Sequence, residues 1–218
     1  MKGVVVEFDF AVLNGAELLF KTAKSYLKKL DDIRLDEPAE ARHLAGADYA
    51  DGLAKLFASV RTKKTAPKAA RELSALFADA VAAAVPAAVT MPFKNFVKAL
   101  VEKDVKVVIA TRADLVAVAP AFASLVGENV ILSQDVSTCY GSAPWDAWRR
   151  ACRFAGLSPA STIVLTGSGF GVKSALRAGM GSVAVVNGHV AYQDFGGADA
   201  VVKTLDAATA KTILGIMR

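Results

Sequence analysis

Short runs of β-branched residues alternate with helix-forming stretches over the second half of the chain, and this alternation constrains the fold more than any other feature. Strands are expected at 105–110, 129–132, 162–166 and 182–186, and helices at 93–103, 114–125, 144–154, 171–178 and 198–207. A first buried strand, Gly-Val-Val-Val-Glu-Phe, is expected at 3–8. Strands that alternate with helices of about ten residues form a parallel sheet with helices on both faces. The sequence therefore predicts an α/β fold.

Residues 16–90 interrupt this alternation with helical patterns alone. Apolar side chains recur at three- and four-residue spacing from Ala16 to Leu30, and further helices are expected at 38–45, 48–60 and 67–85. We therefore predict two units. Residues 1–15 and 91–218 form an α/β core domain, and residues 16–90 form a helical subdomain inserted after the first strand.

The composition limits which partners and which cellular location we expect for the protein. Its 218 residues are 54% apolar, which is enough to bury a sizeable core. The net charge is only +5, and no aromatic or nucleic-acid motif accompanies the Lys and Arg clusters, so no nucleic-acid partner is expected. No apolar run is long enough to span a bilayer, so no membrane partner is expected either. Because Cys139 and Cys152 make no disulfide framework, we expect a cytoplasmic protein.

Two acidic residues follow the first strand. Glu7 and Asp9 lie where this strand ends, and parallel sheets bind ligands at the carboxyl ends of their strands. Such a pair could hold a divalent cation, or act as nucleophile and acid/base. The alternative interpretation is that both are solvated residues at the start of a loop.

Two other strand ends carry groups that suit an anion. Thr111 and Arg112 could bind a phosphate through a hydroxyl, a backbone N–H and a guanidinium, although Thr111 equally suits a helix N-cap. In Thr166-Gly167-Ser168-Gly169-Phe170-Gly171, the backbone at Gly167 and Ser168 could approach an anion at a helix N-terminus. Tight packing of the turn explains the glycines as well. Their spacing is not the dinucleotide-binding pattern.

Taken in order, these segments resemble the haloacid dehalogenase (HAD) superfamily, in its branch of phosphoglycolate phosphatases and β-phosphoglucomutases. Residues 4–13 stand where that family has Asp-x-Asp-Gly-Thr/Val-Leu, residues 92–111 follow its helix, strand and Ser/Thr motif, and residues 171–180 look like the helix after its acidic loop. The resemblance covers nearly the whole chain. It implies a Rossmann-like core with an inserted helical cap, and it assigns the catalytic nucleophile to the position of Glu7 and the acid/base to Asp9.

The sequence departs from the family pattern at the residues that the chemistry needs. Glu7 replaces the nucleophilic aspartate, and Phe10 and Ala11 replace the Gly and Thr/Val, so Phe10 is expected to fill part of the substrate pocket. Gly141 stands where the family has a lysine. The loop at 166–168 contains no carboxylate to hold Mg²⁺.

We therefore predict a dismantled phosphatase site in a non-catalytic protein that needs no cofactor and binds a small phosphorylated ligand or a protein. The alternative is a Mg²⁺-dependent phosphate-monoester hydrolase that uses Glu7 and Asp9 for catalysis and for weak metal binding. A third hypothesis is a small-anion binder that uses Thr111 and residues 167–171 without chemistry. The alanine-rich face of residues 78–88 could close a homodimer, although packing within the cap explains it equally well.

Three side chains outside these motifs are given structural interpretations. Trp145 and Trp148 are three residues apart on one expected helix, and we expect them to pack against the sheet or against a partner. His189, beside Gly188, is interpreted as a turn residue.

Overall fold

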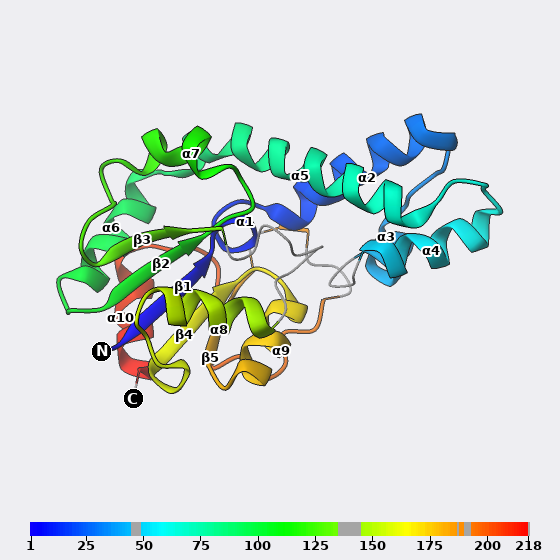
Figure 1. Cartoon of the computed structure of the whole chain (residues 1–218). Coiled ribbons are helices and arrows are strands. Elements are labelled where there is room, and N and C mark those ends of the chain that lie inside the picture. Colours follow the sequence, from blue (N-terminus) through cyan, green and yellow to red (C-terminus); the bar gives the residue numbers. More distant parts are fainter. Residues whose placement is uncertain (45–48, 135–144, 187, 190–192, 218) are drawn as a thin grey trace.

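The protein is built around a parallel sheet. The computed structural model describes residues 1–44, 49–134, 145–186, 188–189 and 193–217 (Figure 1). Within these residues, six strands pair in the order β3-β2-β1-β4-β5-β6, and every pair is parallel. The strands are β1 (Gly3–Glu7), β2 (Lys106–Ala110), β3 (Val130–Ser133), β4 (Thr162–Thr166), β5 (Gly181–Val185) and β6 (Ala200–Val202). The predicted α/β fold with a parallel sheet is confirmed.

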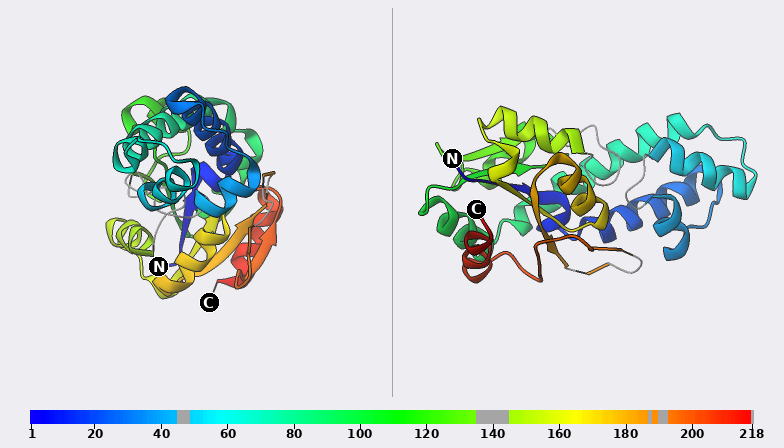
Figure 2. Two further views of the ribbon diagram at one scale, coloured as in Figure 1. Left: turned by 90° about the vertical axis from the view of Figure 1, so that its right-hand side faces the viewer. Right: turned by 90° about the horizontal axis from the view of Figure 1, so that it is seen from below.

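Helices cover both faces of this sheet (Figures 1 and 2). One face carries α8 (Trp145–Phe154) and α9 (Gly169–Ala178), and the other carries α6 (Met91–Val101), α7 (Leu115–Phe122) and α10 (Ala207–Ile216). Alternate side chains of β1 pack on opposite faces of the sheet. Val5 belongs to one apolar cluster with Trp148, whereas Val4 and Val6 belong to the other with Ile213. The central strands β1 and β4 are buried along their whole length, which explains why they form nearly continuous apolar runs.

The inserted helices extend beyond the carboxyl ends of the strands (Figures 1 and 2). After β1 come a single helical turn, α1 (Phe8–Ala11), and then α2 (Gly15–Asp31), α3 (Glu37–His43), α4 (Tyr49–Val60) and α5 (Ala66–Ala88). One continuous apolar cluster joins them to the sheet, because Phe77 of α5 packs on Phe10 of α1 with their ring centroids 6.0 Å apart. The domain boundaries at residues 15/16 and 90/91 stay a prediction.

Local sequence signals explain where several of these helices begin and end. Ser168 caps α9 by accepting a hydrogen bond from the Gly171 N–H, and Gly179 ends the helix with a φ of 78°. Alanine, the strongest helix former, dominates the 23 residues of α5. No single helix in the described part of the chain is long and apolar enough to cross a membrane; only α5 and α6 together, bent by 84°, have the length and composition.

The prediction of a helix at 198–207 is wrong. Residues 200–202 form β6, in which Val201 and Val202 pair with Ala184 and Val185 of β5. The following helix, α10, starts at Ala207, where the Asp206 side chain accepts a hydrogen bond from the Thr209 N–H. The alanines of this segment favour a helix locally, but pairing with a sheet edge overrides that weak preference for the two valines. The first strand is also shorter than expected, because Phe8 already belongs to α1.

Candidate functional site

The centre of the sheet brings the predicted acidic residues together. The strand order reverses between β1 and β4, and this is where open α/β sheets bind ligands. β1 ends at Glu7, and the chain turns at once into α1, which carries Asp9. Both carboxylates are completely buried. Neither is a solvated residue at the start of a loop.

Asp9 accepts hydrogen bonds from the strand end next to its own. The Thr111 hydroxyl donates to Asp9 Oδ1 at 2.7 Å, and the Arg112 backbone N–H donates to Oδ2 at 2.9 Å. Arg112 Nη1 donates to the same Oδ2, also at 2.9 Å. All three donors, a hydroxyl, a backbone N–H and a guanidinium, are groups that the sequence suggests for a phosphate.

Glu7 lies between the same arginine and the end of β4. The Thr166 hydroxyl donates a hydrogen bond to Glu7 Oε2, and Arg112 Nη2 is 3.7 Å from Glu7 Oε1. One guanidinium therefore faces two buried carboxylates. An isolated buried carboxylate would be very unfavourable, so Arg112 is the cation that makes this burial tolerable.

Aromatic rings from the core and from α5 enclose the guanidinium. The Arg112 side chain is 1% exposed, and its Cζ lies 5.2 Å from the Phe10 ring centroid and 5.7 Å from that of Phe77. Guanidinium groups stack favourably on aromatic faces, and they do so more strongly where water is excluded. Phe10, the residue predicted to fill the pocket, lies against Arg112, and Phe77 packs beside it on the same guanidinium.

The glycine-rich turn after β4 is explained by close packing. A side chain at Gly167 would meet the Phe10 carbonyl oxygen at 1.9 Å, and one at Gly169 would meet the Asp194 carbonyl oxygen at 2.3 Å. The nearby donors have partners inside the protein. The Ser168 N–H donates to Thr166 Oγ1 at 3.2 Å, and the Gly169 N–H donates to Gln193 Oε1 at 2.8 Å. A phosphate-binding role for Thr111, Arg112, Gly167 and Ser168 stays a prediction, and it would require these internal bonds to open.

The described residues at this end of the sheet do not fit Mg²⁺. This ion requires about six hard oxygen ligands in an octahedron. The oxygens of Glu7 and Asp9 instead face Thr166, Thr111 and a guanidinium. Among the described residues, no three His, Cys, Asp or Glu side chains are grouped so that they could hold a metal ion. Gly141, at the family's lysine position, lies outside the described residues.

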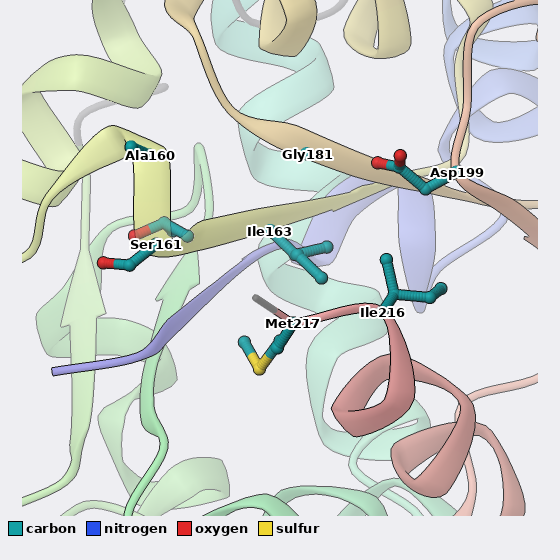
Figure 3. A pocket seen from close by; sticks show the side chains of 8 residues that line it. Ala160, Ser161, Ile163, Gly181, Asp199, Ile216 and Met217 are labelled. Atoms are coloured by element: carbon teal, nitrogen blue, oxygen red, sulfur yellow. The ribbon is translucent and has the colours of Figure 1, made fainter.

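Among the described residues, a cavity of about 270 Å³ lies away from these carboxylates. It opens at the amino ends of β4 and β5, where Ile163, Gly181 and Asp199 line it together with Met217 (Figure 3). The Asp199 carboxylate in this cavity accepts a hydrogen bond from the Ser182 N–H at 2.8 Å. This cavity is at the opposite end of the strands from Glu7, so it is not the site that the motifs indicate.

His189 makes a second contact between the core and the inserted helices. Its Nε2 lies 3.6 Å from Glu40 Oε2, and its Nδ1 lies 3.9 Å from Glu37 Oε1. The imidazole stacks on Phe20 with an interplanar angle of 16°. His189 is therefore more than a turn residue. Sequence reasoning missed the cluster because its members come from three separate segments with no common spacing.

This cluster predicts a pH-dependent stability. Burial raises the pKa of Glu40, while His189 acts in the opposite direction and lowers it. A carboxyl group with a raised pKa holds its proton more tightly in the folded state, so its contribution to stability is lost as the pH rises through that pKa. Glu40→Gln should therefore raise the unfolding temperature relative to the parent, and this increase should be about 2–4 °C larger at pH 8 than at pH 5. A difference of that size corresponds to about 1 kcal/mol.

Thermal unfolding followed by circular dichroism between pH 5 and pH 8 measures this effect. Glu37→Gln is the matched control, because the Glu37 side chain is 53% exposed and no more than a small change is expected. An unfolding-temperature difference between Glu40→Gln and the parent that is constant with pH would contradict the assignment.

Solved structures of other proteins share this architecture over nearly the whole chain. β-Phosphoglucomutase from Clostridium difficile is 13% identical, with a TM-score of 0.73 over 99% of this chain and 96% of that chain. CbbY from Rhodobacter sphaeroides, in complex with phosphate, is 17% identical, with a TM-score of 0.65 over 94% of this chain and 95% of that one. A predicted phosphoglycolate phosphatase from Haemophilus somnus is 15% identical, with a TM-score of 0.61 over 98% of both chains.

These likenesses show the fold. The chain has the fold of solved β-phosphoglucomutases, of a predicted phosphoglycolate phosphatase and of a HAD hydrolase. No sequence model of a protein family matches the chain, and no curated protein matches it. What the protein does must therefore be argued from the site.

Proposed function

We propose that this protein is a non-catalytic HAD-fold protein that acts as a protein-binding module, and that a buried ion-pair cluster replaces its phosphatase site. One observation carries the proposal: the Arg112 guanidinium is enclosed against Asp9 and Glu7, at 2.9 Å and 3.7 Å. The guanidinium thus offsets, from within the chain, one of the two negative charges of the strand-end carboxylates.

The chemistry of phosphoryl transfer supports this proposal. That reaction depends on an exact position for the nucleophile and on cations that neutralise the transferred phosphate. Glu7 moves the reacting oxygens by one methylene relative to an aspartate, and a misplacement of about 1 Å can cost about 100-fold in rate. The loop at 166–168 contributes no carboxylate for a metal. An incoming phosphate would also have to displace the aromatic side chains over Arg112 and break the hydrogen bonds to Asp9.

We favour a protein over a small phosphorylated ligand because the strand-end site is closed. Among the described residues, Glu7, Asp9 and Thr111 are fully buried and Arg112 is 4% exposed, so these groups offer a ligand little surface to contact. A protein partner can use the outer surface without disturbing this cluster. A cytoplasmic location and a homodimer through residues 78–88 stay proposals beside this one.

A phosphate-release screen tests the proposal. The parent chain and Glu7→Gln are incubated with a broad set of phosphate monoesters in millimolar Mg²⁺. We expect the same background release from both proteins, because Glu7 is the position that would carry the nucleophile. Release by the parent that disappears in Glu7→Gln would instead support the alternative, a Mg²⁺-dependent hydrolase that uses Glu7 and Asp9.

A further inference from the structure

The outer surface of α8 and α9 combines an exposed tryptophan with arginines. Trp145 is 37% exposed, whereas Trp148 is fully buried and donates a hydrogen bond from its indole N–H to Ser174 Oγ at 2.7 Å. The two tryptophans of this helix therefore have different roles. Trp148 fixes α8 on α9, and Trp145 faces outward.

Two guanidinium groups flank the exposed indole. Arg149 Cζ lies 5.1 Å from the Trp145 ring centroid, and Arg177 Cζ from α9 lies 6.0 Å from it. Arg149 also donates from Nε to the Ala178 carbonyl oxygen at 3.2 Å, which ties the end of α9 to α8. Arg153 is exposed one turn further along α8. We call Trp145, Arg149, Arg153 and Arg177 the arginine face.

The other cations of α8 and α9 have carboxylate partners, whereas the arginine face has none within the described residues. On the same two helices, Arg150 pairs with Asp146, and Lys173 pairs with Asp194 at 2.8 Å. Within the described part of the chain, Arg149, Arg153 and Arg177 form no ion pair with a carboxylate. This surface therefore presents three positive charges of a chain whose net charge is +5.

Large apolar side chains are exposed on the same helices. They are Phe154, Phe170 and Leu176, which are 66%, 41% and 45% exposed. Tryptophan and arginine are the residue types that most often dominate binding energy at protein interfaces. Positive charge selects a negative partner and speeds its association, while the indole supplies contact area.

We propose that the arginine face binds an acidic segment of another protein, whose carboxylates pair with Arg149, Arg153 and Arg177 while an apolar side chain of the partner packs on Trp145. This inference deepens the proposed protein-binding function and rests on it. A nucleic acid fits less well, because proteins that bind duplex DNA can neutralise about 6–10 phosphates, whereas this face offers three arginines that lack an ion pair within the described residues.

Binding of fluorescein-labelled decaglutamate, followed by fluorescence anisotropy at 50 mM and 300 mM NaCl, tests the inference. The variant is Arg153→Gln/Arg177→Gln, which leaves the Arg149 hydrogen bond to α9 intact. The control is Lys63→Gln/Lys64→Gln, which removes the same charge from two exposed lysines near the far end of the inserted helices. We expect the dissociation constant to rise at least tenfold in the arginine variant and to change less than twofold in the lysine variant.

Four results would overturn the inference. They are no decaglutamate binding by the parent, equal weakening in the two variants, binding of labelled decathymidylate as tight as that of decaglutamate, or a dimer in sedimentation that only the arginine variant abolishes. The last of these results would mean that the partner is a second copy of this chain. The phosphate-release screen is independent of these outcomes, because the arginine face does not include Glu7, Asp9 or Arg112.

Discussion

Arg112→Met is expected to lower the free energy of unfolding by about 3–5 kcal/mol, the cost of breaking a buried pair and leaving charge uncompensated. The substitution keeps most of the side-chain volume but removes the only cation that contacts Glu7 and Asp9 within the described residues. The unfolding temperature of a chain of this length falls by about 2–4 °C per kcal/mol, so a loss of about 6–20 °C is expected. Urea unfolding at pH 7, followed by circular dichroism, measures the free energy.

Two further variants make this prediction specific. Arg153→Met alters an exposed arginine and should change the free energy of unfolding by no more than about 0.5 kcal/mol. Glu7→Gln/Asp9→Asn/Arg112→Met removes all three charges together and should recover at least half of the loss, because neutral replacements of a buried ion pair are often tolerated. An Arg112→Met protein as stable as the parent would show that the guanidinium does not hold this cluster together.

Phe77→Ala should cost about 3–5 kcal/mol as well, the usual range for truncating a buried phenylalanine. Phe77 is 1% exposed, its ring lies against Phe10, and it covers one side of the Arg112 guanidinium. The truncation leaves a cavity where the inserted helices meet the core. It also removes a cation–π contact, which adds to the loss of packing.

Leu76→Ala is the matched control for this variant. Leu76 neighbours Phe77 on α5 but is 43% exposed, so its truncation should cost far less, about 0.5–1 kcal/mol. The same urea titration measures both proteins. Equal losses for the two substitutions would contradict the view that Phe77 seals the site, since a general weakening of α5 would then explain them.

Periodicity in the sequence was sufficient to predict most of the fold. Runs such as Val107–Ala110 are short, β-branched and bounded by turns, and the parallel sheet follows from their alternation with helices. The error at 198–207 has a local cause. Val201 and Val202 lie among alanines, and only pairing with β5 makes them a strand. No pattern within ten residues records that long-range contact.

The candidate site could be predicted in part. Because parallel strands end at one edge of a sheet, Glu7, Asp9 and Thr111 were expected near one another, and the structure places them in contact through Arg112 and hydrogen bonds. The direction of Arg112 could not be predicted. A long side chain can reach solvent or turn inward, and here Phe77, which comes from the inserted helices, encloses it.

The most direct test of the central claim is phosphate release by the parent chain compared with Glu7→Gln, at saturating Mg²⁺ and across phosphate monoesters of different size. If Arg112 pairs with Glu7 and Asp9 in place of a phosphatase site, both proteins release phosphate only at the background rate. Turnover by the parent that is lost in Glu7→Gln would contradict this account and would make Glu7 a working catalytic residue.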